Sequence, residues 1–528
     1  MTRWNALPVL LVVVVLLAMT AGSGGAAPAP ARGGTLTMVI GSDPPSLDPH
    51  RTPSVNIAHA VMYETLVTVD RRTGEFIPGL AESWEISQDG TAITFKLRRG
   101  VKFHDGTPFN AAAVKTTFDR LVSKETNAPG ASWVGTLTRT DVVDDLTVRL
   151  VFSKPYAPIF SSLRISFLAI LSPTAIAKMG ADYGQNPVGT GPFRFKQWIP
   201  NDRIVYERNP DYAWGPAHYK NRGAPNFDQL IIRIVPDEST RVIAFERGDI
   251  DILPGAPARD ARRMMREGKF PFIQIPTTSG TYLGFNVKKP PVNDVRVRRA
   301  IGHATNTDEV ARIALEGLAV PMLSPIAPTI WGYWDGVKQF ALNYDLDRAR
   351  ALLAEAGYRP GPGGAMIKDG RQLEFTVWTY ARMTNVRVAV VLQSQLRAAG
   401  IKLNIEQMEP ATLLASTQRG EHDAIMISYG WPDADILFYF FHSSRLPTTN
   451  RVHYVNPQVD KLLEDGQTTV DTAKRLEVYK QLQRILLAEV PWVPLASELS
   501  VNFNQTAIQD VYYDKFGNLL LLDAFRTR

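Results

Sequence analysis

Residues 373–408 read LEFTVWTYARMTNVRVAVVLQSQLRAAGIKLNIEQM, and the hydrophobic spacing changes twice within this stretch. The first eight residues have the composition of a buried β-strand. Val388, Leu392 and Leu396 then recur at helical spacing. Gly400 is typical of a helix end, and the last eight residues have strand character again. A strand, a helix and a strand in this order predict two parallel strands and therefore an α/β fold.

Three further strands extend this pattern. LIIRIV (230–235) and DIDIL (249–253) have strand character, and the segment between them predicts a helix that begins at Ser239 or Thr240. DAIMIS (423–428) predicts another strand after the unit described above. Parallel pairing is therefore expected in two separate parts of the chain.

Two segments lie where a site is expected. In open parallel sheets, ligands bind in the crevice outside the carboxyl ends of the strands. The segment Tyr380–Arg382 follows one predicted strand, and Tyr429–Asp435 (YGWPDAD) follows another. We therefore expect a ligand site near these two segments.

Composition excludes several classes of function. The 528 residues are 45% hydrophobic and 21% charged, which predicts a folded protein of two or three domains. The net charge of +6 is small for so long a chain, so no nucleic-acid partner is expected. The absence of cysteine rules out disulfides, thiol nucleophiles, Cys-ligated metals and a lipidated cysteine. The eight histidines lack ligand spacing, so neither a metal site nor a cofactor is expected.

The N-terminus, 1–31, has the pattern of a signal peptide. Its apolar run over 7–19 has the length of a signal-peptide core and is short for a membrane span. An A-x-A pattern places the cleavage after Ala31, with Ala27 and Ala21 as alternatives. The other interpretation is an uncleaved membrane anchor. We expect cleavage and, because no cysteine can carry a lipid, a protein that is free in the periplasm rather than a lipoprotein.

No catalytic motif is found in the sequence. GxSxG, HExxH, phosphate-binding and EF-hand loops are missing. GTGPFR (189–194) resembles a phosphate loop but lacks the third glycine and leads into a strand, so we interpret it as a turn. Asp433 and Asp435 could form an acid–base pair, but two carboxylates on one short loop more often shape a turn or pair with a ligand. These observations favour a binding protein over an enzyme.

The stretch AESWEISQDGTAITFKLRRGVKFHDGTPFNAAAVKTTFDRL (81–121) resembles the signature region of extracellular solute-binding protein family 5. This family contains the dipeptide, oligopeptide and nickel receptors of ABC importers. The resemblance continues in family order through 187–193, 236–251, 281–301 and 345–358.

This resemblance implies a two-lobed periplasmic binding protein, of type II and cluster C-like, with an extra α/β subdomain inserted in lobe I. The implied boundaries are 32–60, 185–280 and 490–528 for lobe I, 61–184 for the inserted subdomain, and 281–489 for lobe II. Two chain crossings near 280 and 490 are expected to form the hinge.

The resemblance also implies that the ligand binds in the cleft against the strand end Ser428-Tyr429-Gly430-Trp431. In the peptide receptors an aspartate shortly after this tryptophan pairs with the α-amine of the ligand. Here the intervening residues are missing, so Asp433 either replaces that aspartate or caps the turn.

Tyr380 and Arg382 complete the predicted ligand contacts. Arg382 lies where several peptide receptors carry an arginine that faces the ligand carboxylate, and the alternative is a solvated arginine on a loop.

The expected function is capture of a peptide or related small solute and its delivery to an inner-membrane ABC permease with its ATPase. Ligand contacts made only in the closed state would shift the protein toward closure. A monomer is expected. The alternatives are a receptor for a non-peptide solute or metal chelate with the same fold, and a secreted hydrolase.

Overall fold

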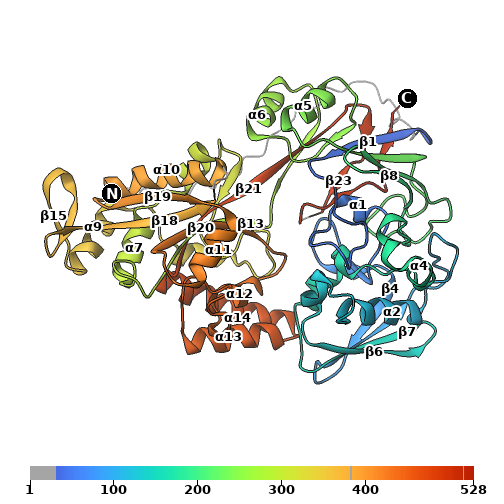
Figure 1. Ribbon diagram of the computed structural model, residues 1–528, viewed down its shortest axis with the longest axis horizontal. Helices are drawn as coiled ribbons and strands as arrows, with labels where there is room; N and C mark the ends of the chain where they lie inside the picture. Colours follow the sequence, from blue (N-terminus) through green and yellow to red (C-terminus); the bar gives the residue numbers. More distant parts are fainter. Residues whose placement is uncertain (1–30, 381–382, 515, 528) are drawn as a thin grey trace, which may run out of the picture.

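The computed structural model describes residues 31–380, 383–514 and 516–527. In this part of the chain a mixed sheet of 12 strands runs through both halves of the molecule (Figure 1). The strands follow the order β19-β18-β20-β13-β21-β11-β1-β10-β9-β8, and β12 and β14 pair with other parts of β21. Their bounds are β1 Thr35–Ile40, β8 Phe193–Ile199, β9 Arg203–Arg208, β10 Gln229–Ile234, β11 Ile252–Leu253, β12 Phe272–Pro276, β13 Ser279–Phe285, β14 Ala319–Pro321, β18 Glu374–Tyr380, β19 Lys402–Met408, β20 Ala424–Gly430 and β21 Trp492–Asn504.

The strand–helix–strand unit predicted at 373–408 is confirmed. β18 pairs in parallel with β19 along its whole length, and β20 pairs in parallel with the other edge of β18. Helix α10 (Met383–Ala398) connects β18 to β19, and Leu392 and Leu396 on this helix pack in one core with Phe375 and Val377 of β18. The remaining helices of this lobe are α7 Val295–His303, α8 Thr307–Glu309, α9 Leu346–Glu355, α11 Pro410–Gln418, α12 Ile436–Phe441, α13 Pro457–Thr468 and α14 Thr472–Glu489.

The strands predicted at 230–235 and 249–253 are parallel in the same sheet, but they do not pair with each other. β1 lies between β10 and β11 and pairs in parallel with both. Helix α5 (Glu238–Glu246) connects β10 to β11. Its N-cap is Asp237, whose carboxylate accepts a hydrogen bond from the backbone N–H of Thr240. The predicted start at Ser239 or Thr240 is therefore wrong by one or two residues, because the aspartate before them already supplies the capping oxygen. Helix α6 (Ala258–Glu267) follows β11.

A separate four-stranded antiparallel sheet, β4-β5-β7-β6, belongs to the same lobe. The hairpin in the signature stretch forms its first two strands, β4 (Ala81–Ile86) and β5 (Ala92–Leu97). Helix α2 (Ala111–Val122) packs on this sheet. The other elements of this lobe are β2 Val67–Val69, β3 Phe76–Pro78, β6 Leu137–Asp144, β7 Thr147–Phe152, β22 Ile508–Gln509, β23 Tyr512–Tyr513, β24 Leu519–Leu520, β25 Phe525–Arg526, α1 Ile57–Ala60, α3 Ile159–Leu163 and α4 Pro173–Met179.

Strand β21 connects the two lobes seen in Figure 1. Its first half pairs with β13 and β14, and its second half pairs with β11 and β12. The chain crossings predicted near 280 and 490 fall next to the starts of β13 at Ser279 and of β21 at Trp492. The domain boundaries themselves stay a prediction.

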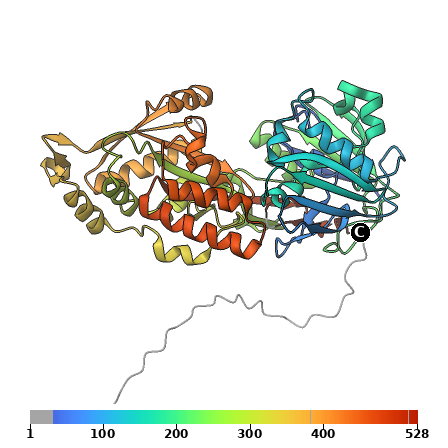
Figure 2. The same ribbon diagram turned by 90° about the horizontal axis from the view of Figure 1, so that it is seen from below.

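The lobes also meet away from the sheet. Figure 2 shows the helices near the C-terminal end of lobe II lying against the strands and loops of lobe I. The backbone N–H of Ala157 in lobe I donates to the carbonyl of Gln467 on α13, at 2.7 Å. The two lobes therefore contact each other directly in this structure.

Candidate functional site

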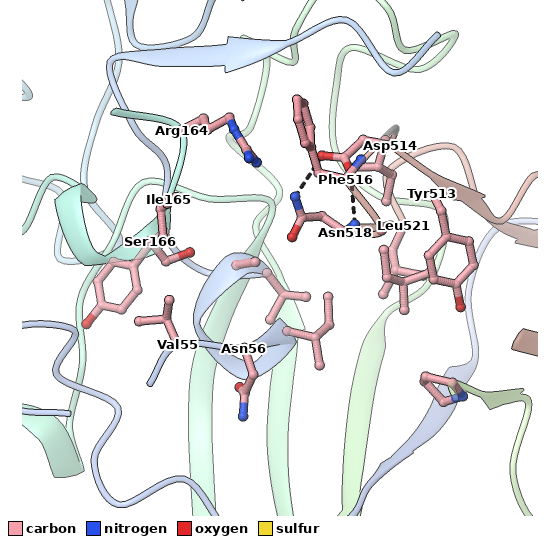
Figure 3. Close-up of a pocket in the computed structure, with 18 of the residues that line it drawn as sticks. Val55, Asn56, Arg164, Ile165, Ser166, Tyr513, Asp514, Phe516, Asn518 and Leu521 are labelled. Carbon is pink, nitrogen blue, oxygen red and sulfur yellow. Dashed lines mark hydrogen bonds between the residues drawn. The ribbon is translucent and has the colours of Figure 1, made fainter. Parts of the chain in front are cut away.

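A cavity of about 930 Å³ lies between the lobes. Most of its wall comes from lobe I, including β1, the segments around residues 55–65 and 164–166, and the C-terminal residues 513–514 and 516–522 (Figure 3). Lobe II contributes Gly430, Trp431 and Pro432, the residues at the carboxyl end of β20. This part of the cavity wall lies at the carboxyl end of a strand, where the sequence analysis expects a ligand site.

The backbone at the end of β20 holds Trp431 at the cavity wall. Gly430 is paired with Ser279 of β13, and the N–H of Trp431 donates to the carbonyl of Thr278 at 3.4 Å. The indole of Trp431 stacks on Trp133 of lobe I, with ring centroids 4.3 Å apart and planes inclined by 17°. Of the predicted contacts, Gly430 and Trp431 line the cavity.

Three other predicted contacts, Ser428, Tyr429 and Tyr380, are not among the residues that line the cavity. Tyr429 is packed against Phe440 and Trp492, with ring centroids 3.8 and 5.5 Å away, and its burial raises the pKa of its phenol. The hydroxyl of Ser428 shares a hydrogen bond of 2.8 Å with Thr281 on the neighbouring strand.

Tyr380, at the end of β18, is the third predicted contact that does not line the cavity. It packs against a small apolar cluster of Leu413, Ile425 and Ile427. Arg382 lies outside the described residues.

Asp433 is buried, with 1% of its surface exposed, and its carboxylate holds four hydrogen bonds. Arg475 of α14 donates to both oxygens, at 2.6 and 2.9 Å, and the N–H of Asp435 donates to one of them at 2.9 Å. The fourth donor is the hydroxyl of Ser161 in lobe I, at 2.7 Å. The carboxylate predicted as a partner for a ligand amine therefore takes part in an ion pair and in the contact between the lobes.

Asp435 lies beside this ion pair. Burial, followed by the neighbouring charge of Asp433, raises the pKa of the Asp435 carboxyl to about 6. Its Oδ1 accepts a hydrogen bond from the side-chain amide of Gln467 at 2.9 Å, and its buried Oδ2 has no hydrogen-bond partner among the described residues. Asp433 therefore supports the interface between the lobes, and neither aspartate lines the large cavity.

Glu64 lines the cavity with a carboxylate that is already engaged. It accepts hydrogen bonds from the side chains of Thr190, Tyr212 and Trp214, at 2.7 to 2.9 Å. Burial raises the pKa of Glu64 to about 7, although these donors act in the opposite direction. Hydrogen bonds within lobe I therefore hold the Glu64 side chain in place at the cavity wall.

Arg164 is a cavity residue that the sequence did not single out. It follows α3 directly, and its guanidinium carbon lies 3.7 Å from the ring centroid of Phe516. No motif surrounds either residue, and they are brought together only because the C-terminal segment folds back onto lobe I. Trp133, in a 3₁₀ helix over Pro129–Val134, also became recognisable only from its contact with Trp431.

The described residues contain no group of three or more acidic or histidine side chains arranged to hold a metal ion. Among the helices of this part of the chain, none is long and apolar enough for a membrane crossing.

Two lobes joined by a shared strand, with a cavity at the strand ends between them, define the class of two-lobed binding proteins. Residues 75–446 match the family model described as bacterial extracellular solute-binding proteins, family 5 Middle. The chain belongs to this family, which confirms the resemblance in the sequence.

Two curated relatives extend over most of the chain. It is 31% identical over 489 residues to the glutathione-binding protein GsiB of Pectobacterium atrosepticum, which covers 90% of this chain and 91% of the relative. It is also 31% identical over 464 residues to the dipeptide-binding protein of Escherichia coli, covering 82% and 83%.

A solved structure shares the fold. NikA from Brucella suis in complex with Fe(III)-EDTA superposes with a TM-score of 0.82 and 26% identity, covering 93% of this chain and 100% of that one. The predicted two-lobed α/β architecture is thereby confirmed.

Proposed function

We propose that the protein is the substrate-binding component of an ABC importer and captures a peptide or related small solute between its two lobes. The observation that carries this proposal is the cavity whose wall combines lobe I with the strand-end residues Gly430, Trp431 and Pro432. A ligand in this position touches both lobes at once, so it stabilises the arrangement in which they are close together.

Peptide ligands are supported by the two relatives described above, a glutathione-binding protein and a dipeptide-binding protein. A volume of about 930 Å³ is at the upper end of the range typical of small-molecule sites. Two indoles at the wall, Trp133 and Trp431, offer apolar surface for side chains of varied shape. Within the proposed site we keep Gly430 and Trp431 as ligand contacts and assign Asp433 to the contact between the lobes.

The remaining parts of the proposal concern the setting of the protein. A cleaved signal peptide over 1–31, which lies outside the described residues, would deliver a non-lipidated monomer to the periplasm. There it would meet the inner-membrane permease and its ATPase. We propose no catalysis, no cofactor and no nucleic-acid partner, in agreement with membership of a solute-binding family.

A second candidate is a metal chelate or another polycarboxylate, as in the NikA complex with Fe(III)-EDTA. The observation that favours it is the guanidinium of Arg164 at the cavity, since a cation suits a ligand with several carboxylates.

Thermal unfolding with and without defined ligands tests the proposal. A dipeptide and tripeptide pool, glutathione and Fe(III)-EDTA are added separately to the purified mature protein, and the midpoint is expected to rise with at least one peptide. A rise only with Fe(III)-EDTA would favour the second candidate. Mass spectrometry of the recovered ligand checks that it is unchanged, and hydrolysis of a peptide would contradict the proposal.

A further inference from the structure

The cavity wall has four charged side chains among its described residues, namely Glu64, Arg164, Arg241 and Asp514. Three of them are held by partners within the protein. Glu64 accepts three hydrogen bonds, as described above. One guanidinium nitrogen of Arg241 donates to the carbonyls of Val235 and Pro236, at 2.8 Å each.

Asp514 is the third charged side chain of the wall that has hydrogen-bond partners within the protein. Its Oδ1 accepts the backbone N–H groups of Phe516 and Asn518, and its Oδ2 accepts the side-chain amide of Asn518, all at 2.8 to 2.9 Å. Both acidic groups of the described wall are therefore engaged by neutral donors.

Arg164 differs from these three residues. Its guanidinium forms no ion pair with a carboxylate in the described chain, and its Nε is buried without a hydrogen-bond acceptor. Burial lowers the pKa of Arg164 to about 10, so the group is still charged at neutral pH. The side chain is partly buried in the cavity wall and has no ion-pair partner among the described residues, so it offers a site that an anion supplied from outside can complete.

The geometry around Arg164 fits one kind of anion. The ring of Phe516 covers one face of the guanidinium at 3.7 Å. The N–H groups lie in the plane of the guanidinium, and the described residues offer them no carboxylate at ion-pair distance. Figure 3 shows Arg164 directed into the cavity, toward the side where Phe516 and Asn518 lie. A planar carboxylate accepts two parallel N–H groups of an arginine edge, so it matches this arrangement.

We propose that Arg164 binds a carboxylate of the ligand, and that the site requires this acid but no free α-amine. This inference rests on the proposed function and narrows its substrate class to carboxylates, such as a short peptide held by its C-terminal end. An amine would find no free carboxylate in the described wall, because Glu64 and Asp514 are engaged and Asp433 is paired with Arg475.

The experiment compares three forms of one dipeptide pool by thermal shift, and then by calorimetry for the dipeptide that gives the largest shift. The forms have free ends, an acetylated N-terminus or an amidated C-terminus. The free and acetylated forms are expected to bind alike, and the amide about 10- to 100-fold more weakly, since it loses a charge-assisted hydrogen bond.

Variants locate the effect at this side chain. R164Q is expected to bind the free dipeptide about 10- to 100-fold more weakly than the wild type, and R164K is expected to lose less affinity. Both variants should reduce the difference in affinity between the acid and amide forms of the dipeptide. R312Q is the matched control, since it removes the same charge from a side chain that is 72% exposed. Ligand-free R164Q should unfold at the wild-type temperature or above it, because a partly buried charge without an ion-pair partner has been removed.

The outcomes separate the two claims. If the wild type binds no form of the pool, the proposed peptide function fails and this inference fails with it. If it binds the acid and the amide equally, or if R164Q binds the acid as tightly as R312Q does, the inference is overturned while the function stands. Loss of binding on acetylation would overturn the statement about the amine.

Discussion

Replacing Ser161 by alanine is predicted to open the molecule, because this side chain joins the two lobes. The hydroxyl of Ser161 donates to Oδ2 of Asp433 at 2.7 Å, and the two residues are only 4% and 1% exposed. When the lobes separate, water replaces this hydrogen bond. The variant loses the bond only in the closed state, so the open state gains population.

The magnitude follows from the surroundings of Asp433. A hydrogen bond to a charged group contributes about 1.5–3 kcal/mol. In the S161A variant, Arg475 still donates to both oxygens of Asp433, so no charge is left unpaired and the lower figure applies. About 1.5 kcal/mol corresponds to a roughly tenfold shift toward the open state.

Small-angle scattering of the ligand-free protein measures the mixture of open and closed forms. The radius of gyration of S161A is expected to exceed that of the wild type. Addition of ligand should make the two radii equal. S162A is the control, because the neighbouring Ser162 is equally buried but donates to the carbonyl of Pro158 in its own segment, at 3.3 Å. Identical scattering from S161A, S162A and the wild type would refute the role of this contact.

Three further predictions concern stability. R475M leaves Asp433 buried without its bidentate partner and should lower the free energy of unfolding by about 3–5 kcal/mol. The double variant R475M/D433N should recover part of this loss. A midpoint of thermal unfolding equal to that of the wild type would contradict the prediction. Burial lowers the pKa of His104 to about 4, below its unfolded value of about 6.5. The unfolded chain therefore binds more protons than the folded one, and stability is lost as the pH falls from about 6.5 toward 4, by up to about 1.4 kcal/mol per pH unit. H104Q should flatten this slope in acid-unfolding curves, and an unchanged slope would speak against it. G189A would place a Cβ 2.1 Å from the carbonyl oxygen of Met62 and should cost about 1–3 kcal/mol; G223A, with 3.6 Å to its nearest neighbour, is the control.

Local sequence patterns predicted the scaffold because the scaffold depends on local periodicity. The buried face of β18 alternates along the strand, and Val388, Leu392 and Leu396 recur at helical spacing in α10, so each of these elements can be recognised from a short stretch of sequence. Parallel pairing also followed from the order of elements. The position of β1 between β10 and β11 could not be read in this way, because it depends on which strand the helix crosses.

The candidate site was only partly predictable, because its side chains are selected by packing. Trp431 could be placed from its position after β20. Asp433 looked available in the sequence, since Arg475 lies 42 residues further along the chain and Ser161 lies 272 residues earlier. Arg164 and Phe516 meet through the return of the C-terminal segment, and no local pattern contains both.

The residues after β20 link binding to closure. Trp431 lines the cavity and also stacks on Trp133 of the other lobe, while Asp433, two residues later, accepts the hydroxyl of Ser161. These contacts hold the lobes together independently of any ligand, so they reduce the free energy that the ligand must supply to favour the closed form. A ligand can shift the equilibrium only by the difference between its affinities for the two forms. A carboxylate held at Arg164 in lobe I anchors the ligand in either form. The contacts to Gly430, Trp431 and Pro432, which exist only when lobe II is near, therefore provide that difference.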